Sequence, residues 1–145
     1  MEGGKIMFMT YAQFVESTKK REFEEYHQFL RLQKELEELY DVEKDFVFFY
    51  PKNLFNNKEL EFIIFLEDGF LIIENAKNGY RYEQFYCELV SKSLVRDDFN
   101  NSNQQLKLVF DNGKELMLNS LADSNQNWIN EYASAIKELY KIILR

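Results

Sequence analysis

The sequence predicts an α+β fold in which helical segments at the two ends of the chain enclose a series of short antiparallel strands. Residues 60–73 contain two β-branched and aromatic runs around Glu67-Asp68-Gly69, the pattern of an antiparallel hairpin. Asn112-Gly113, between two alternating runs, predicts a second hairpin. The residues after these strands are apolar at helical spacing, so a C-terminal helix should follow.

The composition predicts one structural unit with a large core. The chain has 145 residues, of which 46% are hydrophobic and 17% aromatic, with 1 Pro and 5 Gly. Such a chain has few linkers and a core rich in rings. We expect residues 1–44 to form a helical extension packed on a domain that comprises residues 45–145.

The charge of the chain bears on its partners. The formal net charge is -7, and an acidic surface repels nucleic-acid phosphates and anionic lipid head groups. The basic triplet Lys19-Lys20-Arg21 is followed directly by Glu22, which dilutes it. The sequence therefore predicts a protein partner or a second copy of the chain, and no binding of nucleic acid.

A cytoplasmic location is expected. The single cysteine, Cys87, cannot form an internal disulfide, which is typical of a reducing compartment. No apolar run is long enough to span a bilayer, so integral membrane association is not expected. The first residues, MEGGKIMFMT, lack the small-residue cleavage site that follows a signal peptide.

Two helices are predicted in the N-terminal third. Thr10 and Gln13 have the spacing of a capping box, so the first helix should begin there. Ser17-Thr18 can interrupt it, and a longer helix should run from about Thr18 to Tyr40. Its apolar residues cover an arc of about 200°. Either this helix is wedged between the sheet and another helix, or part of the arc is left for a second copy or another protein.

About seven short strands are predicted between the helical segments. Pro51 should stop the first strand, and polar turns should separate the later ones. The segment from Val90 to Asp98 fits a helix or a strand, and Ser91 and Ser93 favour the strand because they are poor helix formers. A type I′ turn is expected at Asn112-Gly113. The predicted strands and hairpins cover residues 46–50, 60–74, 80–85, 90–98, 106–110 and 116–118, with turns at 53–58, 75–79 and 100–103.

The C-terminal helix should begin at Asp123, a good N-cap residue with Gln126 three positions on. Apolar residues then recur at helical spacing and should face the strands. This face consists of Trp128, Ile129, Tyr132, Ala133, Ile136, Leu139, Tyr140 and Ile143.

The order of the elements resembles the pleckstrin-homology-like (PH-like) domain. The match is closest at the end of the chain, where Leu116-x-Leu118 leads through Asp123 to Trp128-Ile129 and Ala135-Ile136. The chain is also similar to small uncharacterised bacterial proteins with such a domain. The resemblance implies a barrel or roll of two nearly orthogonal sheets, with a C-terminal helix that plugs one end and Trp128 as the inward plug. It also implies a general role as a protein- or peptide-binding adaptor.

The resemblance also suggests binding residues. Lipid-binding members use a basic motif in the loop between the first two strands. Here that loop, residues 51–59, has only Lys52 and Lys58 as basic residues, so phosphoinositide binding is not expected. By analogy with the barrel loops, we name Lys52, Asn53, Phe55 and Lys58 as candidate binding residues.

No catalytic constellation is evident, and we expect neither enzymatic activity nor a metal or cofactor. His27 is the only histidine, and Cys87 stands far from it in the sequence. The carboxylate pairs Glu67-Asp68 and Asp97-Asp98 could bind Ca²⁺ or act as an acid–base pair, but solvated turn residues are the better interpretation. An aromatic cluster could stack on bases, although structural aromatics fit better without a basic groove. This cluster comprises Tyr80, Tyr82, Phe85 and Tyr86.

Three functions remain open. The leading hypothesis is a non-enzymatic binding or adaptor module that holds a protein partner or self-associates, which the missing catalytic groups and the wide apolar arc favour. An acidic immunity or inhibitor protein that masks a basic toxin or nuclease is the second. A carrier or other small-ligand protein that uses the mouth of the barrel is the third.

Overall fold

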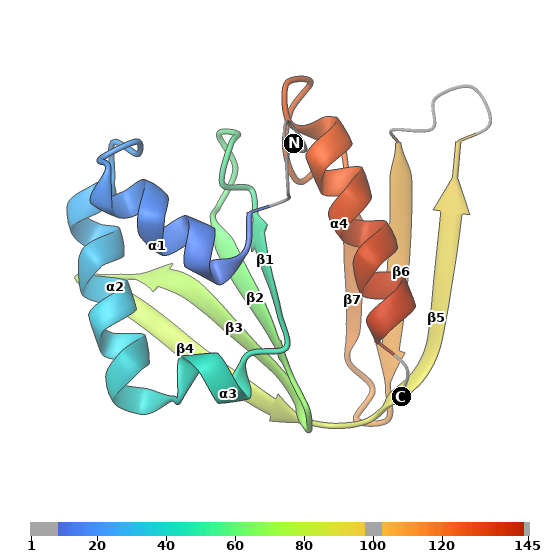
Figure 1. Cartoon of the computed structure of the whole chain (residues 1–145). Helices are drawn as coiled ribbons and strands as arrows, with labels where there is room; N and C mark the ends of the chain where they lie inside the picture. Colours follow the sequence, from blue (N-terminus) through green and yellow to red (C-terminus); the bar gives the residue numbers. More distant parts are fainter. Residues whose placement is uncertain (1–8, 98–102, 144–145) are drawn as a thin grey trace.

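The computed structural model describes residues 9–97 and 103–143, which form four helices and seven antiparallel strands in two sheets (Figure 1). The predicted α+β class, the strand number and the C-terminal helix are therefore confirmed, whereas the strands form two separate sheets and no closed barrel. The helices are α1 (Tyr11–Lys19), α2 (Tyr26–Leu39), α3 (Val42–Asp45) and α4 (Ile129–Ile142). The strands are β1 (Phe48–Lys52), β2 (Glu61–Leu66), β3 (Gly69–Ala76), β4 (Gly79–Tyr86), β5 (Leu89–Arg96), β6 (Gln104–Phe110) and β7 (Glu115–Asn119).

The hairpin predicted at residues 60–74 forms the centre of the four-stranded sheet, whose order is β1-β2-β3-β4. The turn Glu67-Asp68 joins β2 to β3, and Gly69 then takes a φ of 152°. A Cβ atom at Gly69 would lie 1.8 Å from the carbonyl oxygen of Phe85 on β4. Only glycine therefore allows β3 to approach β4 this closely.

The second sheet has the order β5-β6-β7. The strand predicted from Val90 to Asp98 is confirmed as β5, and the hairpin around Gly113 is confirmed as β6–β7. The prediction of a type I′ turn is wrong. Gly113 has a φ of 86°, but Asn112 is not among the described residues that have a positive φ. A type I′ turn needs positive φ at both positions. The turn predicted at 100–103 lies largely outside the described residues.

Different elements cover the two faces of the four-stranded sheet (Figure 1). On one face Phe62 and Ile64 of β2 pack against α1 and α2, within a buried cluster that includes Phe14 and Phe29. On the other face, Ile63 and its same-face neighbours pack against the three-stranded sheet and α4. Since β2 and β3 are covered on both faces, their sequences are nearly continuous apolar runs.

The N-terminal helices differ from the prediction in their bounds. The capping box of Thr10 and Gln13 is present, but the second helix begins at Tyr26 and not near Thr18. The chain reverses between the helices, where Arg21 takes a φ of 58°. The prediction failed here because apolar residues keep helical spacing through the segment between the two helices. Tertiary packing overrides this local preference, and the segment is not helical. Part of the wide arc of α2 is buried, whereas Leu30 and Leu39 are exposed.

Pro51 does not stop the first strand, which corrects the prediction. It lies inside β1, opposite Phe62 of β2. β1 is an edge strand, so a residue without an N–H group can sit in it without breaking a ladder between two neighbours.

The start of the last helix also corrects the prediction. Helix α4 begins at Ile129 with Trp128 as its N-cap residue, and no side chain caps it. Asp123 is buried, and its carboxylate accepts hydrogen bonds from Tyr50 and Asn119. Trp128 is half-buried at the border of the core, whereas Tyr132, one turn later, is 0% exposed and donates its hydroxyl hydrogen to the carbonyl oxygen of Pro51. The fully inward aromatic side chain of this helix is therefore Tyr132.

Candidate functional site at the acidic end of the sheets

The candidate residues of the β1–β2 loop contact another loop of the chain. Lys52 Nζ donates to the carbonyl oxygen of Met117 at 3.1 Å, and Lys58 Nζ donates to that of Ala122 at 2.6 Å. Lys52 Nζ also lies 3.9 Å from Asp123 Oδ1. Both ammonium groups are thus engaged within the chain.

The other two candidates take part in the same contact. The backbone N–H of Asn53 donates to the carbonyl oxygen of Asp123 at 2.9 Å. The ring of Phe55 stacks on Trp128, with centroids 3.9 Å apart and an interplanar angle of 4°. We call this set of contacts between residues 52–58 and 117–128 the loop contact. It brings all four candidates together and fixes the entry to α4, while their binding role stays a prediction.

Asp123 is the centre of the loop contact. The residue is 3% exposed, and its carboxylate accepts the hydroxyl hydrogen of Tyr50 at 2.6 Å and the backbone N–H of Asn119 at 2.8 Å. Burial raises the pKa of Asp123, although these two hydrogen bonds and Lys52 oppose the rise. Burial and the neighbouring carboxylate of Asp123 also raise the pKa of Tyr50 well above its usual range. The arrangement is that of a buried structural network.

Exposed apolar side chains gather at the opposite end of the four-stranded sheet. Leu39 ends α2 and is 58% exposed, and Tyr86 ends β4 and is 70% exposed. Both line a surface hollow of about 690 Å³, together with Tyr40 and Leu66. The hydroxyl of Tyr40 donates to Gln84 Oε1 at 2.7 Å, which holds the end of α2 against β4.

The same hollow carries an excess of negative charge. Asp45, Glu67 and Asp68 line it with one cation, Lys44. Asp45 comes from α3 and the other two carboxylates from the β2–β3 turn, so separate parts of the chain supply the charge. We call this surface, formed by the residues lining the hollow, the acidic end. Its combination of exposed large side chains and carboxylates gives it the composition of a recognition surface.

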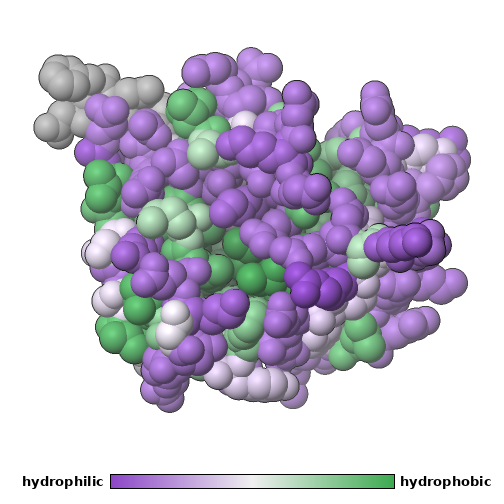
Figure 2. Space-filling model, turned by 180° about the vertical axis from the view of Figure 1, so that it is seen from behind, coloured by the Kyte–Doolittle hydropathy of each residue, from purple (hydrophilic) through white to green (hydrophobic). Residues whose placement is uncertain are grey.

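Hydrophobic side chains are also exposed elsewhere. Figure 2, the view from behind, shows hydrophobic surface at several places, among them the side on which β5 lies, within largely hydrophilic surroundings. Val95 on β5 is 61% exposed. Scattered single residues of this kind are usual on protein surfaces, whereas the acidic end combines two large side chains over one hollow.

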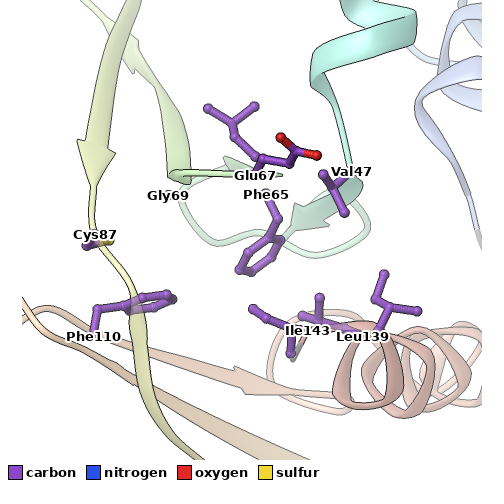
Figure 3. A pocket seen from close by; sticks show the side chains of 10 residues that line it. Val47, Phe65, Glu67, Gly69, Cys87, Phe110, Leu139 and Ile143 are labelled. Carbon is purple, nitrogen blue, oxygen red and sulfur yellow. The ribbon is translucent and has the colours of Figure 1, made fainter. Parts of the chain in front are cut away.

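A cavity of about 390 Å³, lined mostly by hydrophobic side chains, adjoins the acidic end and shares Leu66 and Glu67 with it. Figure 3 shows Phe65, Phe110, Leu139 and Ile143 around this cavity, with Cys87 on one side. Burial, followed by the charge of Asp111, raises the pKa of the Cys87 thiol. The thiol is therefore protonated at neutral pH, the state in which a cysteine is a poor nucleophile.

The structure does not bring the two candidate catalytic residues together. His27 is exposed on the first turn of α2 and its ring contacts Tyr26, whereas Cys87 lies between β4 and β5. Figure 1 shows the start of α2 and the β4–β5 connection at opposite ends of the molecule. Within residues 9–97 and 103–143, no group of three His, Cys, Asp or Glu side chains could hold a metal ion.

The aromatic cluster and the carboxylate pairs have different environments. Tyr82 donates its hydroxyl hydrogen to Glu35 of α2, and the ring of Phe85 packs against Phe70, so both are structural. Tyr86 alone of this cluster is widely exposed. It lies on the same face of β4 as the half-buried Tyr82, so alternation along the strand does not indicate its exposure. Glu67-Asp68 forms the β2–β3 turn. Of the second pair, only Asp97 lies within the described residues.

The acidic end depends on contacts that the sequence does not reveal. Leu39 was one of many apolar residues in the predicted helix, and its exposure follows from the end of α2 at that position.

No helix in the described part of the chain is long and apolar enough to cross a membrane.

A family model described as a protein of unknown function, DUF3908, matches residues 8–134. This range includes both sheets and the residues of the acidic end. No curated protein and no solved structure matches the chain.

Proposed function

The chain belongs to the DUF3908 family of proteins of unknown function, and we propose that it is a non-enzymatic module that binds another protein through its acidic end. The observation that carries this proposal is the exposure of Tyr86 and Leu39 at one hollow that three carboxylates also line. A tyrosine surrounded by polar groups is a common anchor of protein interfaces.

The charge of the acidic end specifies the partner. Glu67, Asp68 and Asp45 outnumber Lys44, and the whole chain carries a net charge of -7. A partner with Lys or Arg side chains around an apolar anchor would complement this surface and be attracted to it before contact. The more specific alternative, an immunity or inhibitor protein that masks a basic toxin or nuclease, uses the same complementarity.

The experiment compares two matched serine variants. Tyr86→Ser removes the ring at the acidic end, and Val95→Ser removes another widely exposed side chain near the far end of β5. Wild type and both variants are immobilised, and the proteins retained from a lysate of the source cells are quantified. A true partner is retained by wild type and by Val95→Ser, and lost by Tyr86→Ser.

The partner found in this way is then titrated in purified form. We expect Tyr86→Ser to weaken binding by about 2 kcal/mol or more, the size of an interface hot spot, and added salt to weaken the wild-type complex. Equal retention by all three chains would contradict the proposal. If wild type forms a dimer that Tyr86→Ser dissociates, the partner is a second copy of the chain and not a basic protein.

We further infer that the fold is a variant of the PH-like domain, with α1 and α2 as an addition. The support is the order of the elements: four antiparallel strands, three more in a second sheet, and a C-terminal helix against the inner faces. The shared core of α1, α2 and the four-stranded sheet supports the extension being part of one structural unit. Superposition of an experimental structure of this chain on PH-like domains tests this proposal. Strands that are connected in a different order in the two folds would contradict it.

A further inference from the structure

We propose that the cavity between the β2–β3 hairpin and the end of α4, most of whose lining side chains are hydrophobic, binds a small amphiphilic cation, a primary amine carried by an unbranched alkyl chain. Its volume of about 390 Å³ is within the range of small-molecule sites. This inference goes beyond the proposed protein-binding role, although the mouth of the cavity shares Leu66 and Glu67 with the acidic end.

Segments that are distant in the sequence supply the walls (Figure 3). Phe65 comes from β2, Phe110 from the end of β6 and Leu139 from α4, and all three are buried in the core. Their positions are therefore set by core packing before any ligand arrives. Val47, just before β1, forms an exposed part of the wall near the mouth.

Cys87 also lines the cavity and adds an uncharged group to its wall. Cys87 lies in the connection between β4 and β5, where its backbone N–H donates to the carbonyl oxygen of Asp68 at 3.1 Å. Its protonated thiol is a polarisable, weakly polar surface that suits an alkyl chain. The hydrophobic side chains of the wall thus offer contact to methylene groups, and no lining side chain offers a counter-charge to an anion.

Glu67 is the one charged side chain among the residues that line the cavity. It is exposed at the mouth and makes no ion pair within the described ranges. Asp68, the next residue of the same turn, adds a second negative charge nearby. Lys92 of β5 reaches the end of α4, where it donates to the carbonyl oxygens of Tyr140 and Ile143 at 2.7 and 3.3 Å. An ammonium group therefore finds a free carboxylate at the mouth, whereas a carboxylate or phosphate head group is repelled there.

Cys87 itself provides the test, because it is the only cysteine in the chain. Its rate of alkylation by iodoacetamide, a neutral reagent, reports whether the cavity is occupied. The wild-type chain is labelled at neutral pH with hexylamine, 1-hexanol or hexanoate, and glutathione is labelled in parallel to correct for effects on the reagent. The change in melting temperature with each compound is a second readout.

We expect hexylamine to slow the labelling of Cys87 at the lowest concentration. Hexanol should bind about two- to fivefold more weakly, the range of one exposed ion pair, and hexanoate more weakly still. From butylamine to octylamine, each methylene that enters the cavity should strengthen binding by up to about fourfold, until the cavity is full.

Two variants check the assignment. Ile142→Trp adds volume at a partly exposed wall position, so the folded variant should lose protection by all three compounds. Glu67→Gln should abolish the preference for hexylamine over hexanol and leave protection by hexanol unchanged. Circular dichroism and the melting temperature show that each variant is folded.

The proposal is overturned if no compound slows the labelling of wild type, if hexanoate protects as well as hexylamine, or if folded Ile142→Trp is still protected. The assay contains no partner protein. A negative result therefore leaves Tyr86-dependent protein binding intact, and loss of that binding leaves this cavity intact.

Discussion

The carboxyl group of Asp123 is buried where β1 meets the loop between β7 and α4. It accepts hydrogen bonds from the hydroxyl of Tyr50 and the backbone of Asn119, and Lys52 lies nearby. A buried carboxylate is tolerated only with such partners. Loss of one partner should therefore cost stability even though the apolar packing is unchanged.

The change Tyr50→Phe removes the hydroxyl that donates to Asp123 and keeps the ring. We expect the free energy of unfolding to fall by about 1–3 kcal/mol, because a buried carboxylate oxygen loses one of its two donors. Urea denaturation followed by circular dichroism measures it. Tyr86→Phe removes an exposed hydroxyl and should change stability by less than about 0.5 kcal/mol. Equal effects of the two changes would contradict the role given to Asp123.

A row of charged residues crosses the four-stranded sheet at directly opposed positions: Lys52, Glu61, Glu74 and Arg81. Burial raises the pKa of Glu61. The charge of Lys52 opposes this rise, and the contact with Glu74 adds to it. A hydrogen bond from Arg81 lowers the pKa of Glu74. Glu61 is therefore the member of the carboxyl pair that holds a proton more readily when the chain is folded.

This difference predicts a pH dependence. Since the pKa of Glu61 is raised on folding, its contribution to stability is complete below the unfolded value of about 4.5 and is lost as the pH rises through the folded value. Glu61→Gln keeps a neutral donor toward Glu74 at every pH, so it should stabilise the protein at pH 7 by roughly 0.2–1 kcal/mol, the size of a cross-strand pair.

Urea denaturation at several pH values tests the change Glu61→Gln. The gain over wild type should shrink as the pH falls toward 4.5, where wild-type Glu61 becomes neutral as well. Glu59→Gln, at an exposed loop position, is the control and should show little gain. A gain that is the same at all pH values would show that the proton on Glu61 is not its cause.

The β2–β3 hairpin is positioned by the close approach of Gly69 to β4. Gly69→Ala should destabilise the protein by about 3 kcal/mol or more, because its Cβ would overlap the carbonyl oxygen of Phe85 and its φ is unfavourable. At Gly79, nothing lies within 4 Å of an added Cβ, so Gly79→Ala should have a small effect. Thermal unfolding of the two variants measures the difference, and similar melting temperatures would contradict this account of the hairpin.

The loop contact illustrates why candidate site residues are hard to identify from sequence. Lys52, Asn53, Phe55 and Lys58 form a polar loop with one ring, a pattern that fits a binding loop. The structure directs their groups to residues 117–128, which are about 65 positions away in the chain. Such long-range contacts leave no periodic signal in the sequence, so their use within the fold could not be predicted.

Across the whole molecule, regular hydrophobic patterns were reliable and ends of elements were not. Both hairpins, the uncertain strand β5 and the capped start of α1 could be predicted from alternation, turn residues and the capping box. The start of α2, the place of Pro51 and the role of Asp123 could not, because tertiary contacts decide them. The acidic end was missed for the same reason: Leu39, Tyr86 and the β2–β3 turn become neighbours only in the folded chain.

The central claim, that the acidic end binds another protein, is tested most directly by photo-crosslinking in the source cells. A benzophenone amino acid is placed at Tyr86 and, in a separate chain, at Val95, both exposed positions. The account predicts an adduct with a basic protein at position 86 that is absent at position 95. No adduct at position 86, or the same adducts at both positions, would contradict it.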